Sequence, residues 1–169
     1  MKQLIDKMTA RLFTRFPALL TRWARKARIL SFSATPWTPF SRSIDKSRLA
    51  LVTTGGVHLK SQAPFDMSDS LGDPSFREIP SGADPAALVI THNYFDHRDA
   101  DKDIGILFPV EGVMLLERFG EIGRVNHRHF SFMGHIRGRK IESLLKTSAP
   151  EVAASLRRDK VDIVLLTPA

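Results

Sequence analysis

The sequence predicts an α/β fold, a mostly parallel sheet flanked by helices, with a basic amphipathic helix at the N-terminus. Short, continuous apolar runs at 48–54, 86–91 and 161–167 alternate with segments of helical period. Strands with such runs are buried on both faces, as in a parallel sheet that helices cover from both sides. A length of 169 residues, with 43% hydrophobic and 25% charged residues, is typical of one globular domain.

Residues 1–30 have the spacing of an amphipathic helix. Apolar side chains recur every three or four positions from Leu4 to Ala27, and arginine and lysine fill much of the rest. Pro17 lacks an N–H group, so we expect it to kink or split this helix near Phe16. Three interpretations stay open: a helix packed on the body or on a partner chain, which the pattern favours, a helix on an anionic membrane surface, and a targeting peptide.

The positive charge is concentrated near the N-terminus. The chain has a formal net charge of +7, and residues 1–48 hold 11 of its 25 Lys and Arg residues but only 2 of its 18 Asp and Glu residues. The rest of the chain is therefore slightly acidic, which argues against nucleic acid as a partner. Cysteine is absent, which excludes a disulfide, a thiolate metal site and a thiol nucleophile. No apolar run approaches the ~20 residues of a membrane span, and we expect a cytoplasmic protein.

A connector at 31–47, rich in proline and serine, leads to a body at 48–169. The elements expected in the body are strands at 48–54, 76–79, 86–91 and 161–167, a short helix at 99–102, and helices at 110–119, 139–146 and 151–158. The last strand is of the buried type, and ligands in α/β sheets bind beyond the carboxyl ends of strands. We therefore expect the chain to break off at its own reaction centre, or else another subunit to supply the missing cover.

The densest polar cluster follows the apolar run at 86–91. It extends from Thr91 to Asp103 and includes His92, Asp96 and His97. Imidazole and carboxylate groups suit a Zn²⁺ or Fe²⁺ site as well as general acid–base chemistry. The spacing resembles the HxHxDH motif of metallo-β-lactamase-like hydrolases, with Tyr94 in place of the second histidine. A loop whose carboxylates cap a helix and pair with Arg and Lys explains the cluster equally well.

Two further clusters lie near predicted strand ends. Thr54, Gly55, Gly56 and His58 follow the first strand, and a glycine pair lets backbone N–H groups approach an anion or makes a tight turn. In the segment 127–135, alternation puts His129 on one face of an extended strand, from which it can point toward the His92 and His97 loop. Histidines satisfied inside the core, His135 included, are the alternative interpretation.

In their order, these clusters resemble the selenoprotein B subunit family of glycine, sarcosine and betaine reductase and of D-proline reductase. The resemblance covers residues 36–169. It is carried by the segments 49–59, 91–96, 101–103, 108–110, 120–123 and 128–134. It implies an oxidoreductase subunit that cleaves C–N bonds reductively, with thiol and disulfide as the electron couple. The implied partners are a small amino-acid-like or amine substrate, a thiol reductant, a pyruvoyl-bearing partner subunit and further copies of the chain.

The family's redox residue, selenocysteine or cysteine, comes just after a strand like 161–168, and this chain has neither. The resemblance therefore implies a selenocysteine codon read as a stop after Ala169, no cofactor in the chain as given, and an inactive 169-residue form. We expect His92, His97 and His129 to lie near the missing nucleophile, Asp96 to orient one imidazole, and residues 54–56, 58 and 135 to bind substrate. A non-catalytic, partner-binding short form and a degenerate metallohydrolase are the alternatives.

Overall fold

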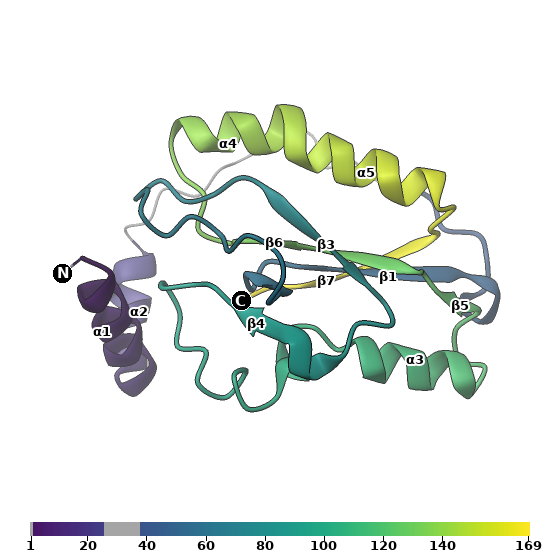
Figure 1. Cartoon of the computed structure of the whole chain (residues 1–169), viewed down its shortest axis with the longest axis horizontal. Helices are drawn as coiled ribbons and strands as arrows, with labels where there is room; N and C mark the ends of the chain where they lie inside the picture. The colour runs from purple at the N-terminus through teal and green to yellow at the C-terminus, as the bar shows by residue number, and fades with distance from the viewer. Residues whose placement is uncertain (1, 26–37) are drawn as a thin grey trace.

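The computed structural model describes residues 2–25 and 38–169, and residues 26–30 of the predicted helix and 31–37 of the connector lie outside them. Helix α1 (Lys2–Arg15) is followed by α2 (Pro17–Ala24). Pro17 occupies the first turn of α2, where its missing N–H costs nothing. The predicted break near Phe16 is confirmed. Figure 1 shows this helix pair at one end of the molecule, beside the body.

The main sheet is mixed, with a parallel centre. Strand β1 (Arg48–Thr53) pairs in parallel with β7 (Ile163–Thr167), and also with β5 (Arg124–Val125) and β6 (Arg128–Phe132). Strand β3 (Phe76–Pro80) runs antiparallel to β6 at one edge. The predicted α/β class is confirmed, and β3 makes the sheet mixed. Figure 1 shows helices on both sides of the sheet.

Helix α3 (Val110–Arg118) covers one face of the sheet, and α4 (Arg139–Ser143), the π-helical η4 (Leu144–Ser148) and α5 (Ala149–Arg158) cover the other. Alternation along β1 serves both layers: Leu49 and Leu51 pack with α3, whereas Ala50 and Val52 pack with α5. The 3₁₀ turns η1 (Ile44–Lys46), η2 (Pro85–Ala87) and η3 (Ile104–Ile106) complete the elements. Within the described ranges, no helix has both the length and the apolar character to cross a membrane.

Two predictions about the segment after β1 are wrong. The run at 86–91 does not join the parallel sheet: β4 (Leu88–Ile90) pairs antiparallel with β2 (Val57–Leu59) in a separate two-stranded sheet. The chain turns away from the main sheet at Gly56, which has a φ of +69°. The short helix expected at 99–102 is a turn, closed by the Asp101 amide on the His97 carbonyl at 2.8 Å.

Strand β7 forms an edge of the described sheet. All five of its residues pair with β1, and the structure places no other described strand beside it. Ile163 packs into the core, whereas Val164 and Leu165 are each 39% exposed and Leu166 is 68% exposed. The apolar run that predicted a buried strand therefore lies at an edge, with apolar side chains exposed on both faces.

Candidate functional site

The carboxyl ends of the parallel strands meet at Thr54. Its amide donates to the Thr167 carbonyl at 3.1 Å, and its hydroxyl accepts from the Ala169 amide at 3.2 Å. The hydroxyl of Thr167 donates to the Leu107 carbonyl at 2.7 Å, which ties the end of β7 to the loop before α3. This is the edge at which open α/β sheets bind ligands.

The glycine pair after Thr54 makes a tight turn. The Gly55 amide donates to the Thr53 hydroxyl at 3.1 Å, and the Gly56 amide donates to the Phe132 carbonyl at 2.9 Å. A Cβ at Gly56 would lie 2.6 Å from the Thr91 carbonyl oxygen and 3.4 Å from the Cβ of His92. The glycines thus bring the 91–103 loop against the ends of β1 and β6. Because both N–H groups have internal partners, the tight turn, and not an anion cradle, describes this segment.

His92 is buried beside this turn. Its Nδ1 accepts a hydrogen bond from the Tyr94 amide at 3.1 Å, and its ring meets Tyr94 and Phe95 edge to face, with the Phe95 centroid at 4.6 Å. Burial, followed by the charges of His135 and His97, lowers the pKa of His92 to about 4. The ring is therefore neutral at pH 7. Because Nδ1 accepts, the proton of the neutral ring lies on Nε2.

Tyr94 joins His92 to a second imidazole. The rings of Tyr94 and His135 stack with centroids 3.6 Å apart and planes at 15°. His135 Nε2 lies 3.3 Å from the Ser70 carbonyl oxygen. Burial is the first cause that raises the pKa of the Tyr94 phenol, so Tyr94 keeps its proton at neutral pH. An imidazole, a phenol and a second imidazole thus form one cluster at the carboxyl edge.

Asp101, and not Asp96, holds an imidazole. The Asp96 carboxylate is bound by the Arg98 guanidinium at 2.6 and 2.8 Å, and this hydrogen bonding lowers its pKa to about 2. His97 Nδ1 donates to Asp101 at 2.8 Å. The prediction that Asp96 orients an imidazole is therefore corrected: Arg98, two positions on, is its closer partner. The sequence feature that could have identified Asp101 as the partner of His97 is its position four residues further along the same turn.

His129 is a part of the sheet core. It is fully buried, its Nδ1 accepts from the Leu51 amide at 3.0 Å, and its Nε2 donates to the Ser81 hydroxyl at 2.9 Å. The ring satisfies an amide of β1 in the gap between its pairings with β5 and β6. Burial, with His127 as a second cause, lowers its pKa to about 4. The predicted alternation correctly places His129 and Phe130 on opposite faces of the strand. The His129 ring, however, faces Phe108 and does not face the 91–103 loop.

His58 is also held internally. Its Nδ1 donates to the Leu59 carbonyl and its Nε2 accepts from the Thr91 hydroxyl, both at 2.8 Å. Both ring nitrogens of His58 and of His129 are therefore engaged, and these are the contacts of structural residues. Of the predicted site residues, the structure brings together Thr54, the glycine turn, His92 and His135, with His97 close enough to act on the pKa of His92.

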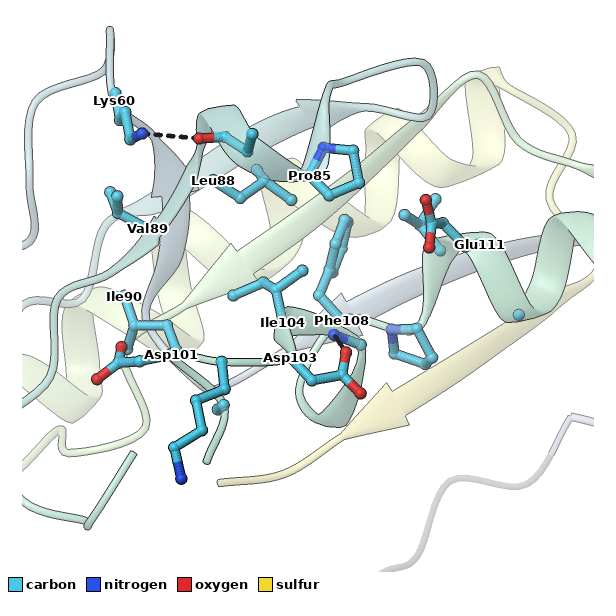
Figure 2. A pocket seen from close by; sticks show the side chains of 17 residues that line it. Lys60, Pro85, Leu88, Val89, Ile90, Asp101, Asp103, Ile104, Phe108 and Glu111 are labelled. Carbon is cyan, nitrogen blue, oxygen red and sulfur yellow. Dashed lines mark hydrogen bonds between the residues drawn. The ribbon is translucent and has the colours of Figure 1, made fainter. Parts of the chain in front are cut away.

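A cavity of about 810 Å³ adjoins the 91–103 loop (Figure 2). Its apolar lining includes Leu88 and Ile90 of β4, Ile104 and Phe108. Its charged lining comprises Lys60, Asp101, Lys102, Asp103 and Glu111. Figure 2 shows the Lys60 ammonium turned to the Ala86 carbonyl, at 2.7 Å. Sequence reasoning missed this cavity, because it forms between β4 and the start of α3, which no local pattern connects.

In the ranges 2–25 and 38–169, no three His, Asp or Glu side chains gather in a way that could hold a metal ion. Asp96 and His97, which carry the resemblance to the HxHxDH motif, are engaged with Arg98 and Asp101.

Comparison with known proteins finds similar chains among reductase subunits. The chain is 34% identical over 131 residues to the D-proline reductase subunit gamma of Acetoanaerobium sticklandii, which covers 78% of this chain and 52% of the relative. It is 28% identical over 139 residues to the glycine reductase complex component B subunit gamma of Symbiobacterium thermophilum, and this match covers 81% of the chain and 32% of the relative. It is 25% identical over 145 residues to the betaine reductase complex component B subunit beta of Peptoclostridium acidaminophilum, and this match covers 75% of the chain and 29% of the relative. No family model and no solved structure matches the chain.

The fold and the polar carboxyl edge define an α/β protein whose curated homologues are subunits of reductases. The chain is a homologue of subunits of the D-proline, glycine and betaine reductases, and the resemblance drawn from the sequence is confirmed. It spans about half the length of the D-proline reductase relative and about a third of the glycine reductase relatives.

Proposed function

We propose that this chain is a part of a reductase subunit that cleaves a C–N bond of a small amine or amino-acid-like substrate, with thiol and disulfide as the electron couple. The main support is the position of the last strand. The end of β7 lies beside Thr54, on the carboxyl edge that also carries the glycine turn and His92. The similarity to D-proline, glycine and betaine reductase subunits indicates the reaction class.

The redox residue would follow Ala169. A selenolate or thiolate there would supply the nucleophile that displaces the amine, and the thiol reductant would supply the electron pair that frees the reduced product and leaves a bond between the two chalcogen atoms. The side chains at this edge suit an anion: a neutral imidazole, a protonated phenol and a hydroxyl are hydrogen-bond donors, and the pKa of Tyr94 is raised. The residues present therefore fit the implied group.

Within this proposal, the chain's own residues handle protons. His97, which donates through Nδ1 to Asp101 at 2.8 Å, is the candidate proton donor to the leaving amine. His92 carries its proton on Nε2 and acts as a hydrogen-bond donor to the anion. Tyr94 contacts both imidazoles, His92 edge to face and His135 in a stack. His129 and His58, both engaged internally, hold the strands that carry the site.

The cavity in Figure 2 is the proposed substrate pocket. Its apolar lining suits a small hydrocarbon body, and the carboxylates of Asp101, Asp103 and Glu111 suit an amine cation. Asp101 joins this cavity to the imidazole of His97. The relatives are named as subunits and complex components, and we propose a partner subunit that activates the amine, a thiol reductant and more than one copy of this chain in the assembly.

The DNA beyond the Ala169 codon tests the proposal. A UGA codon followed by an open frame that encodes a helix supports it, whereas a run of stop codons in all frames contradicts it. A second test replaces that codon by a cysteine codon and, with the proposed partner subunit present, measures two thiol-dependent reactions: release of amine from glycine and betaine, and opening of the D-proline ring, in which the nitrogen stays attached. We expect turnover by the longer chain and none by the 169-residue form.

A non-catalytic form that binds a partner is the second candidate. The exposed apolar side chains of α1 and α2 favour it over the metallohydrolase. Stoichiometric Zn or Fe in the purified chain would reverse that order.

A further inference from the structure

One side of helix α1 is partly buried. Ala10 is 6% exposed and Asp6 and Phe13 are half-buried, and at 100° per residue these positions share one side of the helix. On that side, the Phe13 ring packs on Trp23 of α2 with centroids 5.9 Å apart. Asp6 contributes to the raised pKa of Tyr94, and Arg11 to the lowered pKa of Asp96. The helix therefore lies beside the loop that carries the candidate site.

The opposite side of α1 is apolar and exposed. Ile5, Met8 and Leu12 are 57%, 61% and 46% exposed, and at 100° per residue they form one stripe. Exposed apolar side chains continue through the break at Pro17 into α2: Phe16, Leu19, Leu20 and Trp23. A helix on the surface of a water-soluble domain usually turns such a stripe toward the core. An exposed stripe of this extent marks a surface that another body covers.

Cations border this apolar stripe. Lys7, Arg11 and Arg15 lie along one margin of it and are exposed, as are Arg22 and Arg25 in and after α2. Asp6 is the only acidic residue before Asp45, and it lies on the inner side. A stripe of apolar side chains flanked by arginine and lysine is complementary in charge and polarity to an anionic lipid bilayer.

We propose that α1 and α2 lie on the surface of an anionic membrane, with the stripe of Ile5, Met8 and Leu12 and the exposed apolar side chains of α2 in the interface. In that position Leu12 and its neighbours leave water, and the guanidinium groups meet lipid phosphates. Trp23 and Phe16 are of the type that settles at the boundary of headgroups and acyl chains. The candidate site, beside the inner side of α1, would then lie close to the membrane. This inference is independent of the reductase proposal.

Vesicle flotation of the full 169-residue chain tests it. We expect binding to vesicles of phosphatidylcholine with 30% phosphatidylglycerol, and at least tenfold weaker binding to phosphatidylcholine alone. Leu12→Glu removes an apolar anchor and adds a negative charge, and is expected to weaken binding at least tenfold. Thr14→Glu is the matched control, because it makes the same charge change about 200° around the helix. We expect it to weaken binding about fivefold, the factor for about 1 kcal/mol per charge.

Two controls keep the result unambiguous. Circular dichroism and thermal unfolding of both variants check that the body stays folded, since Leu12 and Thr14 lie outside both core clusters. Raising the salt concentration should release the bound chain. Equal binding to neutral and anionic vesicles, equal losses for L12E and T14E, or a dimer that L12E dissociates in the absence of vesicle binding would each overturn the proposal.

Discussion

The Nδ1 of His97 lies 2.8 Å from the Asp101 carboxylate, and the same carboxylate lines the cavity beside β4. This pair therefore connects the imidazole cluster at the carboxyl edge with the charged wall of the cavity. The carboxylate that binds the imidazole of His97 therefore also faces the cavity proposed to hold the substrate.

Replacing either member of this pair should impair turnover in the longer, redox-competent chain. We expect His97→Ala to lower kcat by 10² or more, the usual contribution of a proton-transferring side chain. Asp101→Asn keeps the size of the side chain but removes its charge, so kcat should fall about tenfold and the pH–rate profile should shift. The control is Asp99→Asn, which alters an exposed carboxylate paired with Lys102. Turnover unchanged in H97A would remove His97 from the mechanism.

The buried histidines make the fold sensitive to acid. His92 and His129 have pKa values near 4 in the folded chain and near 6.5 when unfolded. Between these values the unfolded chain binds more protons, so the free energy of unfolding falls as the pH drops from about 6.5 to 4 and levels off below 4. The upper bound is about 3 kcal/mol for each histidine. Urea unfolding at pH 7, 6, 5 and 4 measures this loss, and a flat profile would contradict it.

The carboxylate of Asp159 holds β6 to the end of α5. Its two oxygens accept from Arg128 at 2.6 and 2.8 Å, and Asn126 donates to it at 3.0 Å. The Arg128 hydrogen bond lowers the pKa of Asp159 to about 2. Asp159→Ala removes two of the hydrogen bonds of a mostly buried guanidinium, which keeps only the exposed Glu78 as an ion-pair partner, and should destabilise the chain by about 3 kcal/mol. Asp99→Ala, at an exposed pair, should leave the unfolding midpoint unchanged.

Gly56 fixes the turn that brings His92 to the sheet. Its φ is +69°, and a Cβ there would lie 2.6 Å from the Thr91 carbonyl oxygen. Gly56→Ala should therefore cost about 2 kcal/mol or more in unfolding free energy, from backbone strain and the clash together. Gly82→Ala is the matched control, because a Cβ at Gly82 meets nothing within 4 Å. Equal midpoints for the two variants would show that the turn tolerates a side chain.

Local patterns predicted the elements that carry strong periodicity. Helix α3, the break at Pro17 and the alternation of Phe130 and Phe132 against His129 are as expected. What the patterns could not give was pairing between distant segments. The apolar run at 86–91 is compatible with any strand neighbour, and the turn at Gly56 assigns it to β2. The choice between Asp96 and Asp101 depends on which cation lies nearer, and Arg98 decides it.

Strand β7 also has a consequence for handling the protein. Beyond β1, its backbone amides and carbonyls have no described strand to pair with, and Val164, Leu165 and Leu166 are exposed beside them. Natural proteins protect edge strands from pairing with other chains by a lysine, a proline or a bulge, and none of these occurs between Ile163 and Thr167. Preparations of the 169-residue chain should therefore precipitate as concentration rises. A lysine in place of Leu165 should keep the chain in solution and leave its pairing with β1 intact.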